Sequence, residues 1–411
     1  MIEADVMDFD RSRLRDIDLW DPALKAAPAE TFLRWSQEDP FYILHGGAPQ
    51  AVVTRFDDAK RALEDHSLFS NVKRPWLGTE KYKYWQGLPV VTDTDPPTHT
   101  KLRRLLSPAF SPRRLAMVEE GVRAFIAERL DAIEAEGSGA FGLMTHFGRE
   151  LSIHLLLGLL MDIRPEDRGR FVAVSDGLTL FASLPAGSPA PQSYLDAWAS
   201  VRAYCEDLIE RRRREPVDDL VSNIIAAHDT EGRLTTDELF ATFTILFVAG
   251  ISGVAHLIGW MIWRLCMHRD QLDLLRAQPD LINSAMEETL RIEPIGYTAL
   301  RWVQSDFEMS GLRFFENMPV MVVEGASSFD PQRYHDPLRF DITRKPRRDA
   351  LPFGYGVHHC IGAPVARMAA RHAVTMLLTR FPELRLQRPG VRPEIVGSPK
   401  DRGPASIPLL I

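Results

Sequence analysis

A cysteine at the entrance of a helix is the residue of this sequence best placed to do chemistry. Cys360 follows a short stretch with two glycines, Gly354 and Gly356, which permit tight turns and close backbone approach. A helical pattern begins directly after it, with Pro364 suited to the first turn. Because unpaired N–H groups and the positive end of a helix dipole face such a cysteine, we expect a lowered thiol pKa. A thiolate there is prepared to bind a metal ion.

The loop that ends at this cysteine carries a resemblance to a known family. From Phe353 to Gly362 it reads FGYGVHHCIG, which resembles the cysteine-ligand loop F-G-x-G-x-H-x-C-x-G of the cytochrome P-450 superfamily, soluble bacterial type, at every fixed position. The resemblance covers essentially the whole chain. It implies a haem-thiolate monooxygenase with haem b, Cys360 as the axial iron ligand, and Phe353 and Gly362 against the cofactor. The implied fold is mainly α with small β-sheets, a triangular helical prism around a buried haem.

A second motif agrees with the first. Glu288 and Arg291 form an E-x-x-R pair, 72 positions before Cys360 as the family requires. Residues three apart share a helix face, so this acid and base can pair. By resemblance, Arg344 from a later irregular segment joins them. We expect this trio to have a folding role and no chemical one.

Four cations are expected to hold the haem propionates. His99 and Arg103 lie four residues apart and share a helical face. Arginine suits a carboxylate because its planar fork donates two parallel hydrogen bonds. By resemblance, the propionate contacts are His99, Arg103, Arg301 and His358.

The sequence departs from the family on its longest helix. Relatives typically read A-G-x-acid-Thr, whereas this chain reads Ala249-Gly250-Ile251-Ser252-Gly253. A thiolate ligand favours O–O cleavage, but cleavage also needs protons, which the acid and alcohol normally organise. Gly253 has no hydroxyl for this task. Ala249 and Gly250 are expected to line an oxygen groove beside the iron.

Several groups are candidates to replace the missing pair. Ser252, His256 one turn later, or a polar group of the substrate with ordered water could deliver protons. Alternatively, hydrogen peroxide replaces dioxygen and brings its own protons, or the enzyme performs a reaction other than monooxygenation. A third class of function is a haem-binding sensor without catalysis.

The leading hypothesis is hydroxylation or O-dealkylation of a hydrophobic small molecule with dioxygen. We expect tentative pocket contacts from mostly apolar side chains: Trp76, Val248, Ile295, Tyr297 and Leu300. Electrons are expected from a separate ferredoxin and its reductase. A basic face on the thiolate side of the haem is predicted from Arg103, Arg104, Arg113, Arg347, Arg348 and Arg371.

Helical periodicity dominates the elements that must position these groups. It predicts helices near residues 98, 112–137, 145–162, 192–214, 235–268, 279–292 and 361–380, the one from 235 opening with Thr235 and Glu238 as a capping box. Strand patterns are short and fall near 41–44, 51–54, 300–303, 320–323 and after 383. We expect one domain over 1–411, with β-rich parts near 41–54, 297–324 and 383–411. The irregular stretch 66–97, rich in aromatic residues, is expected to be functional.

Composition narrows the class of protein. The net charge of −7 gives no electrostatic footprint for nucleic acid. Three scattered cysteines form no disulfide framework and fit a reducing cytoplasm; Cys205 and Cys266 are expected to be inert. The acidic start MIEADVMDFDRSRLRD resembles neither a signal peptide nor an anchor. Although Leu239 to Trp263 lacks charge, its glycines, threonines and histidine favour a buried core helix over a membrane span.

Overall fold

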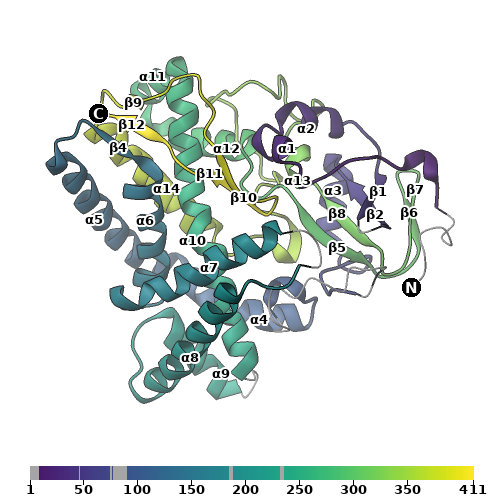
Figure 1. Cartoon of the computed structure of the whole chain (residues 1–411), viewed down its shortest axis with the longest axis horizontal. Helices are drawn as coiled ribbons and strands as arrows, with labels where there is room; N and C mark the ends of the chain where they lie inside the picture. Colours follow the sequence, from purple (N-terminus) through teal and green to yellow (C-terminus); the bar gives the residue numbers. More distant parts are fainter. Residues whose placement is uncertain (1–8, 46, 75, 77–89, 185–187, 232–235) are drawn as a thin grey trace.

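Most of the long helices lie on one side of the molecule and the largest sheet lies on the other (Figure 1). The computed structural model describes residues 9–45, 47–74, 76, 90–184, 188–231 and 236–411. The longest helices are α5 (Pro112–Glu136), α7 (Arg168–Ser183), α8 (Gln192–Arg214), α10 (Thr236–Met267) and α14 (Ala363–Arg380). The shorter helices are α1 (Pro22–Ala26), α2 (Ala29–Trp35), α3 (Phe56–Glu64), α4 (Thr98–Leu106), α6 (Arg149–Ile153), α9 (Leu220–Glu231), α11 (Arg269–Ala277), α12 (Ile282–Ile292) and α13 (Glu324–Ser327).

The helix α5 shows how the local sequence sets these boundaries. Ser111 caps its start, with the Oγ atom accepting from the Arg114 amide, and Pro112 takes the first helical position. Gly137 ends it with a left-handed φ of 63°. Buried side chains recur every three or four residues along it: Val118, Val122, Ile126, Leu130 and Ile133.

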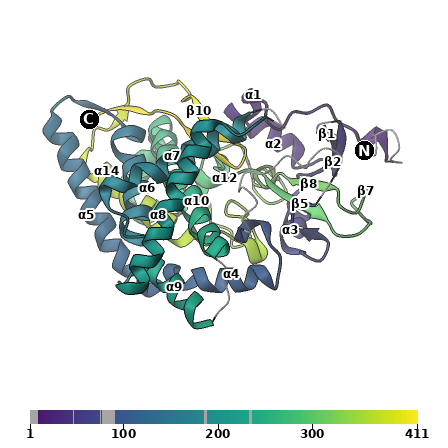
Figure 2. The same ribbon diagram turned by 60° about the horizontal axis from the view of Figure 1, so that its bottom comes forward.

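The helix α10 runs through the interior, and the turned view again places it inside, with α5 and α14 to one side (Figure 2). By length and composition it could cross a membrane, but 72% of its most apolar window is buried within the protein. The fold therefore accounts for the charge-free stretch, as expected for a core helix.

Within the described residues, the strands form four small sheets. The largest has the order β1-β2-β8-β5-β3, with β2 and β8 parallel and the other neighbours antiparallel. Its strands are β1 (Phe41–His45), β2 (Ala48–Val53), β3 (Phe69–Ser70), β5 (Ala299–Val303) and β8 (Pro319–Val322). The others are the pair β6 (Phe307–Met309) with β7 (Leu312–Phe314), the sheet of β4 (Ala140–Gly142), β12 (Pro408–Leu410) and β9 (Arg385–Leu386), and the hairpin of β10 (Ile395–Ser398) with β11 (Asp401–Pro404).

The hairpin of β10 and β11 lies along α10, where Figure 1 shows the two elements side by side. A glycine on the helix makes this approach possible: a Cβ atom at Gly259 would lie 2.8 Å from Cγ of Pro404 and 2.7 Å from Sδ of Met144. The C-terminal hairpin is thereby held against the middle of the core helix.

The predicted fold class, mainly α with small sheets, is confirmed. Each predicted helix is present, although the segment 145–162 combines α6 with π-helical turns at Met144–Gly148 and His154–Leu160. The predicted strands are present within the three expected β-rich parts. The capping residue Thr235 lies outside the described residues, as does 77–89 of the aromatic stretch. The helices α1, α2, α3, α7, α9, α11 and α13 and the strands β3 and β4 were not predicted, and β6 and β7 lie in the predicted β-rich part 297–324 without having been predicted as strands.

Candidate active site

The loop before α14 presents Cys360 at the start of that helix, as predicted. Gly354 and Gly356 adopt φ values of 70° and 68°, which L side chains rarely adopt. At Gly356 a Cβ atom would also lie 3.0 Å from the Leu63 carbonyl oxygen, so glycine permits the loop to approach α3. The Cys360 amide donates to the Phe353 carbonyl at 2.9 Å and closes the loop.

The surroundings of the Cys360 thiol only partly match the expectation. Burial raises its pKa, and the smaller opposing effects of the Gly362 and Ala363 backbone amides, with Arg103 and Arg367, lower it. The prediction that the helix terminus would lower the pKa overall was therefore wrong, because loss of hydration outweighs the amides. No cluster of three ligating side chains exists among the described residues. A metal ion at Cys360 would thus take its other ligands from outside the described chain.

Next to this loop, three buried side chains have nitrogen atoms without partners among the described residues. They are both ring nitrogens of His99 on α4, Nε2 of His358 and Nε of Arg301 on β5. The ring centroids of His99 and His358 lie 4.1 Å apart. Arg103, on the same helix as His99, donates to the carbonyl of His359, so a second contact joins α4 to the cysteine loop. The four predicted cations therefore come from α4, from β5 and from the cysteine loop itself.

Among the described residues, Asp95 and Glu324 act on Arg301 through space, and no carboxylate accepts a hydrogen bond from the unpartnered nitrogens of this cluster. Burial, with help from His99, Arg301 and Arg103, lowers the pKa of His358 to about 3. Burial likewise lowers the pKa of Arg301 to about 10 and that of His99. Unused buried donors are costly in a folded protein, so this cluster calls for an acceptor such as a carboxylate. Two propionates beside a thiolate fit that requirement, and the residues present fit a haem.

On α10, the two polar candidates Ser252 and His256 both contact one carboxylate, that of Asp401. Ser252 donates from Oγ to Oδ2 of Asp401 at 2.5 Å, and Nδ1 of His256 lies 3.1 Å from Oδ1 of the same residue. A Cβ atom at Gly253 would meet no atom within 4 Å, whereas one at Gly250 would lie 2.7 Å from Leu156. Packing against Leu156 is thus sufficient reason for Gly250, and its role in an oxygen groove remains a prediction.

A family model described as cytochrome P-450 matches residues 29–395 of this chain. The chain is a cytochrome P-450. Over 346 residues it is 35% identical to 6-deoxyerythronolide B hydroxylase of Saccharopolyspora erythraea, covering 82% of this chain and 83% of that protein. It is 32% identical to mycinamicin IV hydroxylase/epoxidase of Micromonospora griseorubida, covering 87% of this chain and 89% of that protein. With its relatives named as hydroxylases, this P-450 is a monooxygenase with a haem-iron cofactor.

Solved structures agree with the family. The LnmA P-450 hydroxylase from the leinamycin biosynthetic pathway of Streptomyces atroolivaceus superimposes with a TM-score of 0.82 at 34% identity, covering 93% of this chain and 96% of that one. A myxobacterial P-450 in complex with myristic acid gives a TM-score of 0.84 at 30% identity, covering 95% of this chain and 98% of that one. The fold of this P-450 is therefore that of soluble bacterial relatives.

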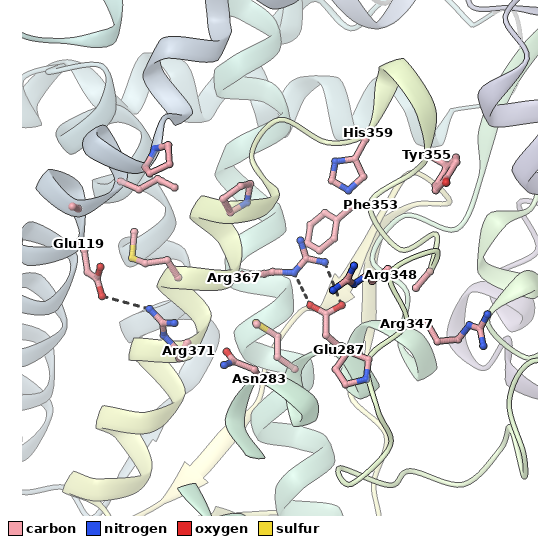
Figure 3. A pocket seen from close by; sticks show the side chains of 18 residues that line it. Glu119, Asn283, Glu287, Arg347, Arg348, Phe353, Tyr355, His359, Arg367 and Arg371 are labelled. Atoms are coloured by element: carbon pink, nitrogen blue, oxygen red, sulfur yellow. Dashed lines mark hydrogen bonds and ion pairs between the residues drawn. The ribbon is translucent and has the colours of Figure 1, made fainter. Parts of the chain in front are cut away.

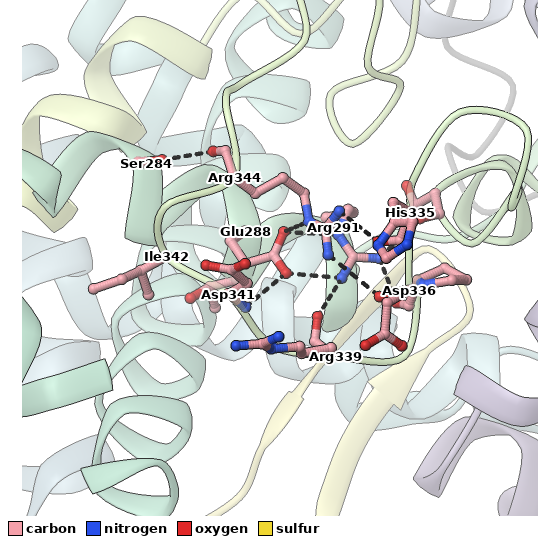
Figure 4. A network of polar contacts seen from close by, with 12 residues as sticks. Ser284, Glu288, Arg291, His335, Asp336, Arg339, Asp341, Ile342 and Arg344 are labelled. Atoms are coloured by element: carbon pink, nitrogen blue, oxygen red, sulfur yellow. Dashed lines mark hydrogen bonds and ion pairs between the residues drawn. The ribbon is translucent and has the colours of Figure 1, made fainter. Parts of the chain in front are cut away.

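The E-x-x-R trio of this P-450 forms the predicted contacts (Figure 4). Arg291 donates to both carboxylate oxygens of Glu288 at 2.8 Å, and Arg344 donates to Oε2 at 3.1 Å. Arg291 also donates to the backbone carbonyls of Ser328, Pro337 and Arg339. The trio thereby connects α12 to the irregular segment 328–344, which leads to the cysteine loop.

The expected substrate contacts lie in different surroundings. Val248, Ile295 and Leu300 are partly buried. Tyr297 is 0% exposed and its hydroxyl faces the Leu19 carbonyl at 3.4 Å, so it has no surface to offer a substrate. Its inclusion in the pocket is corrected, because its ring fills the core against Phe32. Trp76 packs beside the five-stranded sheet, where its Nε1 donates to the Pro49 carbonyl.

On the side of the cysteine loop, the surface holds a hollow of about 800 Å³ (Figure 3). Phe353 and His359 line it from the loop, and Arg367 stacks on the Phe353 ring at 4.3 Å. Three of the predicted basic residues also line it: Arg347, Arg348 and Arg371. Acidic partners offset some of this charge: Asp349 for Arg347, Glu119 for Arg371 and Glu287 for Arg367.

Sequence reasoning missed Asp401, the carboxylate that binds Ser252 and His256. It lies 149 positions from Ser252, and no local pattern around it indicates a site. It also missed Glu293, which is fully buried and bound by Arg264, Arg392 and Arg402. The only sequence feature that could have pointed to Glu293 was its place directly after the helix with the E-x-x-R motif.

Proposed function

We propose that this P-450 binds haem b and hydroxylates a hydrophobic small molecule with dioxygen, O-dealkylation being the related outcome. The supporting observation is the cluster of His99, Arg301 and His358, whose buried nitrogens lack acceptors among the described residues. Haem b has two propionates that would accept from them. Bound there, the haem would supply dioxygen activation and oxygen insertion.

The chain's own residues have distinct tasks in this proposal. The Cys360 thiolate binds the iron, and Phe353 and Gly362 lie against the cofactor. Val248, Ile295 and Leu300 offer an apolar surface that orients the substrate and excludes water. Ala249, exposed on α10, lines the oxygen groove.

A substrate from secondary metabolism is favoured by the relatives. Two relatives are named for 6-deoxyerythronolide B and mycinamicin IV, and a structural neighbour for the leinamycin pathway. We propose a polyketide-type molecule for this P-450.

The net charge of −7 and the three free cysteines support work in the cytoplasm as one domain over 1–411, with no nucleic acid or membrane partner.

Electrons are proposed to come from a ferredoxin and its reductase, with the ferredoxin docking at the hollow beside the cysteine loop. Arg348 is exposed there, and rim charges steer an acidic partner. Arg348→Glu should slow ferredoxin-driven turnover about tenfold at low salt and leave peroxide-driven turnover unchanged. Arg34→Glu, an exposed charge on α2 away from the hollow, is the matched control. Equal losses in both variants would contradict docking at this face.

The second candidate is a peroxide-using P-450, or one whose reaction is not monooxygenation. It is favoured by Gly253, which stands where the family's alcohol is expected and has no hydroxyl. Peroxide brings its own protons, so it would bypass that position.

Binding and turnover with named probes test the proposal. Purified haem protein is titrated with 6-deoxyerythronolide B and with myristic acid, and the shift of the haem absorbance is followed. Each probe is then incubated with NADH, ferredoxin and reductase, or with hydrogen peroxide. A product with one added oxygen atom in the first system supports the proposal. Product in the peroxide system alone supports the second candidate.

A further inference from the structure

Two side chains of the core helix bind one carboxylate from the C-terminal hairpin. Ser252 and His256 lie one turn apart on α10, and between them they take both oxygens of Asp401 on β11, at 2.5 and 3.1 Å. The carboxylate thus contacts the helix exactly at the position where the family's acid is absent. Because Oδ1 accepts from His256, the ring proton must lie on Nδ1.

The hairpin is shaped for this contact. At Gly403 a Cβ atom would lie 2.1 Å from the His256 ring, so only glycine lets β11 approach the helix. Gly397 pairs with Arg402 across the hairpin at a φ of 87°, and a Cβ there would overlap the Asp401 carbonyl oxygen at 1.7 Å. Glycines on both strands therefore fix the position of Asp401.

The neighbouring residue anchors the strand from the other side. Arg402 is fully buried and donates to Glu293 at 2.8 Å, to the Lys25 carbonyl at 2.6 Å and to the Pro294 carbonyl at 3.3 Å. With Arg402 held and Gly403 against His256, Asp401 has little freedom to leave Ser252.

The charges around Asp401 keep it ionised. Burial by itself raises the pKa of this carboxyl, but His256 and the hydrogen bond from Ser252 outweigh burial, and the net pKa lies below the ordinary value. About 34% of the Asp401 side chain remains accessible, so the network is not sealed from water.

We propose that Asp401 supplies from the hairpin the carboxylate that α10 lacks, and that Ser252, Asp401 and His256 form a proton relay to the space beside Gly253. A Cβ atom at Gly253 would meet nothing within 4 Å, so open space able to hold water adjoins α10 one residue after Ser252. The inference rests on the proposed monooxygenase function and assigns its proton source.

The relay balances without any change of oxidation state. His256 takes a proton from solvent at Nε2 and passes its Nδ1 proton to the Asp401 carboxylate. The Asp401 carboxyl then protonates Oγ of Ser252 as the Ser252 hydroxyl gives its proton to the water beside Gly253, which leaves Asp401 ionised again. The imidazole returns to the Nδ1–H form by proton exchange with solvent. One proton enters at the imidazole and one leaves at the serine.

A spectroscopic readout tests the pairing without turnover. In the reduced carbon monoxide complex, ¹⁵N NMR of histidine-labelled protein should show His256 protonated at Nδ1, and Asp401→Ala should shift it towards the Nε2–H form. An Nε2–H ring in the unmodified protein would overturn the inference.

Coupling measurements test the relay itself. With the probes above, Asp401→Asn should lower product formed per NADH at least about tenfold and raise peroxide release, because a positioned acid typically contributes more than that. Peroxide-driven turnover should stay at the original level. Glu394→Gln, which removes an exposed carboxylate beside the same hairpin, should change neither.

Two further variants keep the test decisive. If Asp401→Asn fails to fold, as judged by the carbon monoxide spectrum, Ser252→Ala should give the same uncoupling. In a serial relay, Ser252→Ala combined with Asp401→Asn should be no worse than the worse single variant. Unchanged coupling in Asp401→Asn or Ser252→Ala would overturn the relay. If the unmodified protein oxidises neither probe, the proposed substrate class fails separately, while the NMR result still judges the pairing.

Discussion

Arg301, His99 and His358 each have a buried nitrogen that no described group of the chain accepts. In a folded protein such atoms are rare, and they gather here around the one cysteine with a helix behind it. At the residue scale, the site is thus recognised by hydrogen bonds that the chain leaves unmade. Sequence types alone could not show this, because each cation could equally have been a solvated surface charge.

Arg301→Leu should weaken haem binding. A hydrogen bond to a charged group contributes about 1.5–3 kcal/mol, which corresponds to roughly ten- to hundredfold in haem affinity. Transfer of haem to an excess of apomyoglobin measures the loss rate. Arg313→Leu, on the exposed strand β7, should retain haem as the unmodified protein does. Equal retention in Arg301→Leu would contradict the propionate role.

Gly253→Thr should raise the ratio of product to NADH consumed. The added side chain enters open space, and its hydroxyl stands beside Ser252 to hold a proton. The substitution should change the stability of α10 by only a few tenths of a kcal/mol, since glycine costs about 1 and threonine up to about 0.7 kcal/mol relative to alanine inside a helix. Product and NADH are measured in the same reaction. An unchanged ratio would argue against a defect in proton delivery.

At the scale of elements, two buried ion networks hold the segments that carry the site. Glu288 joins α12 to the segment before the cysteine loop through Arg291 and Arg344. Glu293, just beyond α12, joins α10 to β11 through Arg264 and Arg402. Only the first was predictable, because its spacing matches a motif, whereas the second depends on arginines far apart in the sequence.

Glu288→Gln should destabilise the protein by about 3–5 kcal/mol, since it leaves two buried arginines without a countercharge. Urea denaturation measures the loss. The neighbouring Glu287→Gln is the control: Glu287 pairs with the partly exposed Arg367, and such pairs contribute about 0–1 kcal/mol. Similar losses in the two variants would contradict a folding role for the trio.

The Glu293 network should make stability depend on acid pH. Burial alone raises the pKa of Glu293, but Arg264, Arg402 and Arg392 lower it to about 2, below the ordinary 4.5. A carboxyl with a depressed pKa stabilises the fold fully above pH 4.5 and loses this contribution as pH falls towards 2. The shift corresponds to about 3 kcal/mol. The stability difference between the unmodified protein and Glu293→Gln should therefore narrow over this range, and a constant difference would contradict the network.

At the scale of the whole molecule, the distribution of helices and short strands was largely predictable. Long, strongly periodic segments such as Pro112–Glu136 and the apolar α10 were placed within a few residues. The helix α3 was missed, although Phe56, Ala59 and Leu63 carry a helical spacing. The two-residue strand β3 has no periodicity to detect and exists through pairing with Trp302 and Val303.

The residues of the candidate site also differ in whether local sequence could predict them. Cys360 and the E-x-x-R pair were predictable because local motifs mark them, whereas the four cations were predicted only from the resemblance to the family. Asp401 was not predictable, because its role arises from a hairpin packed onto α10, and Tyr297 was misplaced because burial of a side chain depends on contacts such as that with Phe32. The residues that sequence reasoning missed or misplaced are thus those whose surroundings depend on long-range contacts.

The account depends most directly on a bond between the Cys360 thiolate and haem iron. The absorbance of the reduced carbon monoxide complex measures it. The account predicts the strongly red-shifted band that a thiolate ligand gives, and its loss in Cys360→His with haem still bound, while Cys266→Ser keeps it. A protein purified without porphyrin, or a carbon monoxide complex without the red shift, would contradict the account.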